Sequence, residues 1–232
     1  MEIILYAEGL FKSYNGNNVI KDISLSVSKG DFLSIIGNSG AGKSTLLYLL
    51  AGIEKPDRGK VLLEGKDLFS LNDTEIAAVR AKKTSFVFQF DNLFQDLTVL
   101  ENVMLPGIIS GRKRKEIKNN AELLIEYMHI SRIRDSKPSE ISGGEQQRTA
   151  LARAMITNPE ILFLDEPTGS LNSEAGNIIM DILKNLNKEH KVTIIQVTHN
   201  ITNAQRGNRI ILLKDGVIQE ELTTELDINT KN

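Results

Sequence analysis

The chain has 232 residues, a length that fits one large domain or a domain with a subdomain. Its residues are 41% hydrophobic and 25% charged, an ordinary globular mix that excludes a wholly disordered chain and a collagen. With 28 basic and 30 acidic residues, the formal net charge of −2 gives no electrostatic case for nucleic acid or an anionic membrane surface as partner. The absence of Cys excludes disulfides, thiolate metal sites and cysteine nucleophiles.

The sequence predicts a soluble intracellular protein. Met1–Leu10 carries two Glu and lacks the basic start and apolar core of a signal peptide. The longest run without a charged residue, Val192–Gln205, has 14 residues and includes Gln, His, Asn and Thr. A membrane span needs about 20 apolar residues, so a role at a membrane would require a partner.

Alternating strand and helix patterns predict an α/β fold with a mostly parallel sheet. An apolar helix face is expected over Ser173–Lys188, and another in the Lys-rich segment Ile117–Met128. Short apolar or β-branched runs indicate buried strands at Phe32–Ile36, Val61–Leu63, Thr84–Phe88, Ile161–Leu164 and Val192–Val197.

The two ends of the chain carry a different pattern from its middle. Residues 1–30 alternate as in an antiparallel sheet, and Ile210–Leu222 is typical of a hairpin about Asp215–Gly216. From Asn92 to Pro159 the patterns are helical, which indicates an inserted helical subdomain. The prediction is one domain with an α/β core including the antiparallel part (1–91 and 160–222), a helical subdomain (92–159) and a frayed tail (223–232).

One loop carries the strongest local signal for nucleotide binding. It follows the strand at Phe32–Ile36, precedes a helical run over Thr45–Ala51, and fits G-x-x-x-x-G-K-[ST]. Glycines let the backbone curl around phosphate oxygens at a helix N-terminus. The lysine then reaches the β- and γ-phosphates, and the serine hydroxyl ligates Mg²⁺. The alternative, a Gly-rich turn that matches by chance, would not explain eight matching positions. The loop consists of Gly37, Asn38, Ser39, Gly40, Ala41, Gly42, Lys43 and Ser44.

A pair of carboxylates ends the apolar strand at Ile161–Leu164. Asp165 is expected to hold Mg²⁺ through water, and Glu166 to orient or deprotonate a water that attacks the γ-phosphate. Acidic residues also end strands in many α/β proteins for structural reasons. The phosphate loop favours the catalytic interpretation here.

Taken with these motifs, the segment Ile141–Arg148, which reads Ile-Ser-Gly-Gly-Glu-Gln-Gln-Arg, makes the pattern specific. The chain resembles the ATP-binding-cassette (ABC) ATPases, whose signature is commonly Leu-Ser-Gly-Gly-Gln. The phosphate loop, signature, acidic strand and His199 follow in that family's order. The segments Phe86–Phe90, Leu97–Val103 and Pro167–Leu171 resemble the branch that serves lipoprotein release, macrolide export and antimicrobial-peptide export. Glu145 stands where Gln is common, a change that the same branch also shows.

The resemblance implies a P-loop ATPase that takes ATP and Mg²⁺, with a role for each matching residue. Tyr14 would stack on adenine, Gln89 would sense Mg²⁺ and the γ-phosphate, and His199 would contact the γ-phosphate. Catalysis is assigned to Glu166, His199, Lys43 and Gln89, and the metal to Ser44, Gln89 and Asp165. Nucleotide binding is assigned to Tyr14, the loop from Gly37 to Ser44, Thr45, and the signature residues Ser142, Gly143, Gly144 and Glu145.

Taken alone, several of these residues have simpler interpretations. An isolated aromatic residue such as Tyr14 usually packs in the core or on the surface, and a polar residue such as Gln89 can simply end a strand. An isolated His usually has a structural role. Ser142 and its glycines read as an N-cap and an open helix N-terminus, which suits a phosphate. Asn172 stands where the family usually has an Asp that bridges the two nucleotide sites, so it retains an acceptor but loses the charge.

The resemblance also implies two protein partners and no nucleic acid. One is a second nucleotide-binding subunit, in an ATP-dependent head-to-tail dimer expected to be a homodimer. The other is a membrane-spanning transporter subunit that holds the chain at the cytoplasmic face of the membrane. Its docking residues are predicted to be Phe90, Asn92, Leu93, Phe94 and Leu97, although core packing is the plainer interpretation of each aromatic.

The function expected is ATP hydrolysis that powers export or release of a substrate. A non-transport ABC regulator of a membrane partner, of the cell-division type, is the alternative. A P-loop kinase is a weaker one, because it would leave the signature segment unexplained. An adjacent reading frame for a membrane protein with four transmembrane helices and a large external domain would favour export or release.

Overall fold

The computed structural model describes residues 2–89 and 92–223. Its larger sheet has the strand order β10-β9-β3-β8-β7-β6, with β10 antiparallel to β9 and all other pairs parallel. This confirms the mostly parallel sheet of the predicted α/β fold. The strands are β3 (Phe32–Ile36), β6 (Thr84–Val87), β7 (Ile161–Asp165), β8 (Thr193–Val197), β9 (Arg209–Lys214) and β10 (Val217–Thr223).

The N-terminal region forms a second, antiparallel sheet with the order β2-β1-β4-β5. The run Val61–Leu63, which was predicted among the α/β strands, belongs to this sheet, where Leu63 pairs with Leu5. An apolar run indicates burial but does not identify the strand that pairs with it. The strands are β1 (Ile3–Tyr14), β2 (Asn17–Ser28), β4 (Arg58–Leu63) and β5 (Lys66–Asp67).

The predicted hairpin about Asp215–Gly216 is present as β9 and β10. It runs one residue further than expected, because Thr223 still pairs with Arg209 and so belongs to the strand rather than to the tail. The rest of the predicted tail lies outside the described residues.

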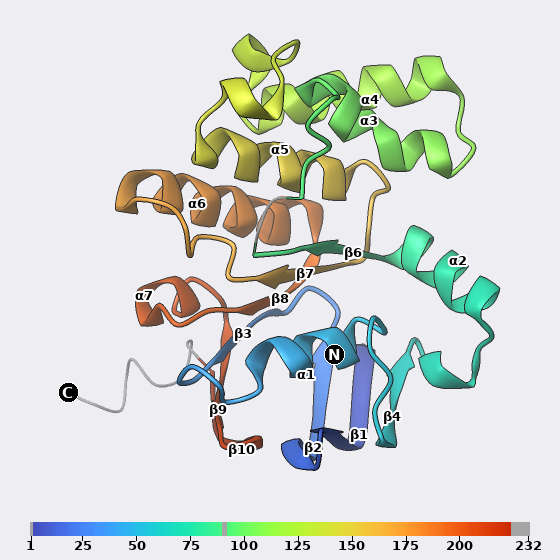
Figure 1. The fold of residues 1–232 in the computed structure, drawn as a ribbon, viewed down its shortest axis with the longest axis vertical. Helices are drawn as coiled ribbons and strands as arrows, with labels where there is room; N and C mark the ends of the chain where they lie inside the picture. The colour runs from blue at the N-terminus through green and yellow to red at the C-terminus, as the bar shows by residue number, and fades with distance from the viewer. Residues whose placement is uncertain (1, 90–91, 224–232) are drawn as a thin grey trace.

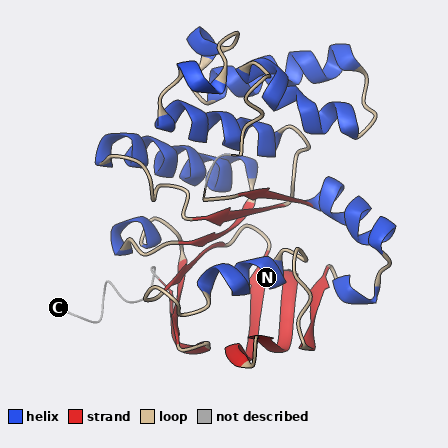
Figure 2. Ribbon diagram, in the orientation of Figure 1, coloured by secondary structure: helices blue, strands red, loops and turns tan. Residues whose placement is uncertain are grey.

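The segment from 92 to 159 contains helices and short 3₁₀ turns and no strand. Figures 1 and 2 show α3, α4 and α5 stacked above α6, with the strands below it. None of the helices in the described part of the chain has the length and apolar character to span a bilayer. The helices are α1 (Lys43–Leu50), α2 (Asp73–Lys83), α3 (Val99–Ile109), α4 (Arg114–Tyr127), α5 (Gly143–Met155), α6 (Ser173–His190) and α7 (Ile201–Ala204).

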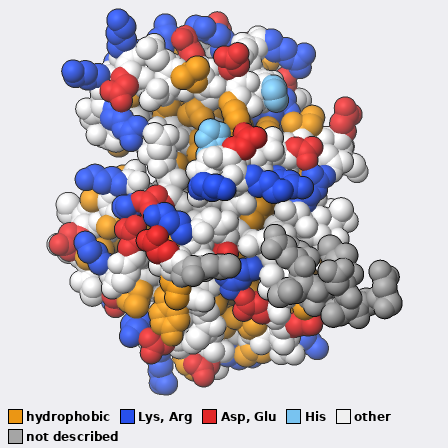
Figure 3. Space-filling view, turned by 180° about the vertical axis from the view of Figure 1, so that it is seen from behind, with side chains coloured by type: hydrophobic (Ala, Val, Ile, Leu, Met, Phe, Trp, Pro, Cys, Tyr) orange, Lys and Arg blue, Asp and Glu red, His pale blue; other side chains and the backbone are white. Residues whose placement is uncertain are grey.

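Helix α2 was not predicted from the sequence, because it buries none of its residues and so has no apolar periodicity. Its signal lies in its cap: the Asn72 side chain accepts from the Glu75 amide, and Glu75 accepts from the Asn72 amide. This reciprocal pair fixes the start of a helix that has no apolar stripe. Basic and acidic side chains are interspersed on the face seen in Figure 3, as the near-zero net charge suggests.

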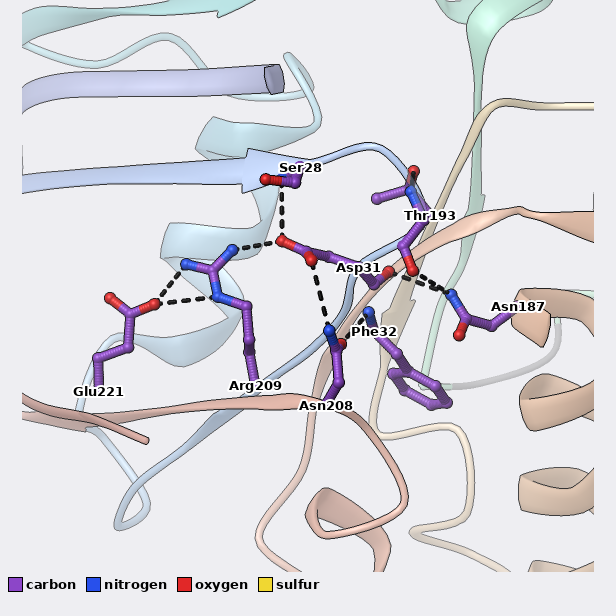
Figure 4. A network of polar contacts seen from close by, with 9 residues as sticks. Ser28, Asp31, Phe32, Asn187, Thr193, Asn208, Arg209 and Glu221 are labelled. Carbon is purple, nitrogen blue, oxygen red and sulfur yellow. Dashed lines mark hydrogen bonds and ion pairs between the residues drawn. The ribbon is translucent and has the colours of Figure 1, made fainter. Parts of the chain in front are cut away.

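Two apolar clusters form the core on the two sides of the larger sheet. One joins that sheet to α3–α6, and the other fills the space between α1 and the antiparallel sheet. A buried polar network fastens β3 to its neighbours (Figure 4): Asp31 accepts from the Ser28 amide at 2.8 Å and pairs with Arg209, which also pairs with Glu221. Because both oxygens of the buried Asp31 carboxylate have donors, its burial is compensated, and the start of the strand that leads into the phosphate loop is fastened to β2 and β9.

Candidate nucleotide site

Four parallel strands end at one edge of the sheet, and each is followed by a residue predicted to act on nucleotide. The register aligns Ile35 of β3 with Val197 of β8, and Val197 with Asp165 of β7. Carboxyl ends of parallel strands form the usual ligand crevice of such sheets. A pocket of about 580 Å³ lies here, lined by Val19, Ser39, Gly40, Gly42, Lys43, Ser44, Thr45, Gln89, Glu166 and His199.

The phosphate loop has the conformation that its glycines allow. Gly42 has a φ of 96°, and a Cβ there would lie 2.9 Å from the Val19 carbonyl oxygen, so a larger residue would distort the loop. The Lys43 Nζ donates to the carbonyls of Gly37 and Asn38, at 2.9 and 3.0 Å, and lies across the loop. No side chain caps the N-terminus of α1, so its amides are open to an anion.

Asp165 lies almost fully buried beneath this loop, with a donor on each carboxylate oxygen. The Ser44 Oγ donates to Oδ1 at 3.0 Å, and the Tyr48 hydroxyl donates to Oδ2 at 2.9 Å. Burial and the hydrogen bond to Asp165 raise the pKa of Tyr48 to about 12. The phenol therefore stays protonated, and remains a donor, throughout the physiological range.

The oxygen donors around the loop fit Mg²⁺. Ser44, Gln89 and Asp165 offer hard oxygen atoms, and Ser44 and Gln89 line the pocket itself. In the part of the chain that the structure describes, no group of three or more His, Asp or Glu side chains forms a metal cage. Mg²⁺ at a nucleotide site needs no such cage, because it takes one or two protein ligands together with phosphate oxygens and water.

Glu166 and His199 line the pocket and are in direct contact. The Glu166 Oε2 lies 3.0 Å from His199 Nδ1 and accepts from the His199 amide at 3.4 Å. Glu166 has a φ of 49°, a left-handed conformation that is uncommon for a non-glycine residue and is found at functional sites. The Glu166 amide donates to the Val197 carbonyl, which fixes this turn to the end of β8. The arrangement presents a carboxylate, held by a histidine, to the space above the phosphate loop.

Tyr14 does not line the pocket, although it lies close to it. Its hydroxyl donates to Glu54, and the Lys12 Nζ lies 5.3 Å from the ring centroid. Burial and the Glu54 carboxylate raise its pKa to about 12. Tyr14 is 39% exposed, and adenine stacking stays a prediction. Gly37, Asn38 and Ala41 belong to the loop but are not among the residues that line the pocket.

The signature residues Ser142 to Glu145 also lie outside this pocket. Glu145 Oε2 accepts from the Ser142 amide at 2.9 Å and from its hydroxyl at 2.7 Å, and Arg132 donates to Oε1 at 2.8 Å. The Ser142 hydroxyl and Arg132 lower the pKa of Glu145 to about 2. The carboxylate therefore orders the turn. Ser142 and Gly143 are exposed whereas Gly144 is buried, and the nucleotide role of the signature residues remains a prediction.

Sequence reasoning missed Val19, which lines the pocket, and Tyr48, which contacts Asp165. The run Thr45–Ala51 was interpreted only as an apolar helix. A signal was nevertheless present, because Tyr48 follows Ser44 by four positions and therefore lies on the same face of α1. That spacing brings both hydroxyls to Asp165.

Fold and pocket together define a P-loop nucleotide-binding protein, and the comparisons identify which kind. Residues 20–169 match the model of the ABC transporter family, and the chain belongs to that family. It is an ATP-binding cassette ATPase, as its motifs predicted. The lipoprotein-release branch is likewise confirmed by its relatives.

Among the relatives, the lipoprotein-releasing system ATP-binding protein LolD of Aquifex aeolicus is 45% identical over 223 residues, which are 96% of this chain and 99% of the relative. An uncharacterized ABC transporter ATP-binding protein of Escherichia coli, YbbA, is 42% identical over 204 residues, 88% of this chain and 90% of the relative. The ATP-binding cassette MJ0796, solved as a dimer bound to ADP and Pi, superposes with a TM-score of 0.88 at 38% identity, covering 95% and 98% of the two chains.

Asn172, the departure from the family pattern, caps the N-terminus of α6. Its Oδ1 accepts from the Ala175 amide at 2.9 Å. Because Asp caps a helix as well as Asn does, Asn172→Asp should retain the fold and restore the missing charge. If that charge couples the two nucleotide sites, we expect higher ATP turnover with unchanged ATP affinity. Turnover and nucleotide titration measure this, with Asn72→Asp, which changes the cap of α2, as the matched control; equal turnover in Asn172→Asp would show that the loop tolerates Asn.

Proposed function

We propose that this chain is the subunit that hydrolyses ATP to power release or export of a substrate through a separate membrane-spanning subunit. The observation that supports it is the single pocket in which the phosphate loop, Gln89, Glu166 and His199 meet. The relatives named for a lipoprotein-releasing system make a lipid-modified protein the proposed cargo. The proposed place of the chain is the cytoplasmic face of the membrane, where its partner holds it.

Several residues in and around the pocket have roles that follow from their positions. The α1 amides and Lys43 bind the β- and γ-phosphates, and the lysine would exchange its loop carbonyls for phosphate oxygens. Ser44, Asp165 and Gln89 would hold Mg²⁺, which supplies charge neutralisation for the phosphates when it is bound. Glu166 orients the attacking water and takes its proton, and His199 holds that carboxylate in place. Tyr14 would stack on the adenine.

The position of the signature turn supports a dimer. Ser142, Gly143 and Gly144 form a helix N-terminus that lies outside the pocket of their own chain. A head-to-tail dimer would place this turn over the ATP of the other subunit, so that closure requires ATP and reopening requires its cleavage. A homodimer is proposed, and the solved relative MJ0796 is itself dimeric.

An apolar groove beside β6 is the proposed docking site for the membrane subunit. Its volume is about 390 Å³, and its walls come mainly from α2, β6, α3 and α5. Of the predicted docking residues only Phe94 lines it: Leu93 is buried in the core, and Phe90 lies outside the described residues. The lining consists of Ala81, Thr84, Ser85, Phe86, Phe94, Leu105, Pro106, Ile109, Ser110, Arg153, Ala154 and Thr157.

Two measurements test the function. Purified chain should release phosphate from ATP in Mg²⁺ but not in EDTA, and Lys43→Ala should abolish the release; turnover that survives Lys43→Ala would contradict the assignment of the pocket. The chain, tagged and expressed in its native cell, should then co-purify with a polytopic membrane protein that alters its ATP turnover when both are reconstituted. Capture without a change in turnover would favour a non-transport regulator.

A further inference from the structure

Tyr48 belongs to none of the sequence motifs, but it contacts Asp165 and two aromatic residues of the segment Phe86–Phe90. Its hydroxyl donates to Asp165 Oδ2, while its ring packs against Phe86, with centroids 5.5 Å apart, and against Phe88, at 6.4 Å. The ring centroids of Phe86 and Phe88 lie 4.5 Å apart, and Phe86 stacks on Phe163. The phenol is therefore fixed at both ends, by a carboxylate and by an aromatic cluster.

We propose that Tyr48 is a positioning residue for magnesium-dependent nucleotide binding, because it fixes the Asp165 carboxylate and, through it, the Ser44 hydroxyl. The inference rests on the proposed role of Ser44 and Asp165 toward Mg²⁺. Asp165 Oδ1 accepts a hydrogen bond from the Ser44 hydroxyl, which turns the lone pairs of the Ser44 oxygen away from the carboxylate. Tyr48 donates to Oδ2, so a donor on each oxygen fixes the plane of the carboxylate.

Removal of this hydroxyl would have a specific consequence. Asp165 is 2% exposed, so Oδ2 would lose its donor in a place that water does not reach freely. The carboxylate would then turn toward a new donor and release Ser44 from its present orientation. Removal of a group that hydrogen-bonds to a metal ligand typically lowers the metal affinity by about 10- to 100-fold.

Tyr48→Phe isolates the hydroxyl, because the ring and its packing on Phe86 and Phe88 are retained. We expect the affinity for a fluorescent ATP analogue to fall about tenfold in Mg²⁺ and to stay unchanged in EDTA. Mn²⁺ titration by electron paramagnetic resonance, with ATP present, should show the same tenfold loss. Tyr127→Phe is the matched control, since it removes a buried hydroxyl without a hydrogen-bond partner from the helical segment.

A merely structural role would give a different result. Equal affinity losses in Mg²⁺ and EDTA, or no loss in either, would overturn the proposal. A double-mutant cycle covers the case in which Tyr48→Phe lowers the melting temperature: if Tyr48 acts through Asp165, Tyr48→Phe should add no loss of Mg²⁺-dependent affinity to Asp165→Asn, whereas additive losses refute it. Wild-type phosphate release, measured first, separates failure of this inference from failure of the proposed function.

Discussion

Glu166→Gln should bind ATP normally and lose hydrolysis by about 10²- to 10⁴-fold, because only the proton acceptor is removed. Gln has the shape of Glu, and its amide oxygen still accepts from the His199 amide and ring, so the pocket should retain its geometry. The left-handed turn at Glu166 is likewise unaffected by a change at the end of the side chain. Phosphate release and nucleotide titration measure the two effects separately.

The same variant should accumulate as a dimer with ATP and Mg²⁺, because closure needs bound ATP and reopening needs its cleavage. Size-exclusion chromatography with light scattering detects the change in mass. Glu160→Gln is the matched control: it alters a carboxylate beside β7 at the end opposite to the pocket, where its partners are Lys29 and Lys83. A monomeric Glu166→Gln with near-normal turnover would refute the role of Glu166, and loss of hydrolysis in Glu160→Gln would show that the effect is not specific.

Local motifs were sufficient to predict the sheet edge at which the pocket lies. The loop from Gly37 to Ser44 determines its own surroundings, because only a strand before it and a helix after it allow its amides to converge. Once Ile161–Leu164 and Val192–Val197 are strands of the same parallel sheet, Glu166 and His199 must follow at the same edge. For these residues, the strand that each one follows in the sequence is enough to predict where it lies in the fold.

Contacts between distant side chains could not be predicted in this way. The pairing of β4 with β1 depends on the whole antiparallel sheet, and the apolar run Val61–Leu63 does not indicate which strand it pairs with. Tyr48 appeared as one more apolar residue of α1 until β7 brought Asp165 to it, 117 positions along the chain. The Glu145 carboxylate, whose role toward nucleotide stays a prediction, accepts from Ser142 and Arg132, contacts that the motif alone did not indicate.

Phe94→Ala should leave ATP turnover of the isolated chain nearly unchanged and weaken assembly with the membrane subunit by about thirtyfold. Truncation of a central aromatic anchor commonly costs about 2 kcal/mol of binding, and about 1.4 kcal/mol corresponds to a tenfold change. Phe94 is 54% exposed and lines the groove, whereas the phosphate pocket is lined by other residues. Affinity for the detergent-solubilised partner, measured by surface plasmon resonance, gives the effect.

The backbone of Phe94 is held independently of its ring, so Phe94→Ala should test the ring alone. Asn102, fully buried on α3, accepts from the Phe94 amide at 2.8 Å and donates to its carbonyl at 3.1 Å. Loss of the ring should therefore leave the segment in place and the melting temperature close to wild type, whereas a core Phe would cost about 3–5 kcal/mol of stability. Leu123→Ala, at an exposed leucine of α4 outside the groove, is the control for unspecific apolar contact. A large drop in melting temperature, or equal binding losses in both variants, would return Phe94 to a structural role, because a docking anchor must change the affinity without changing the fold.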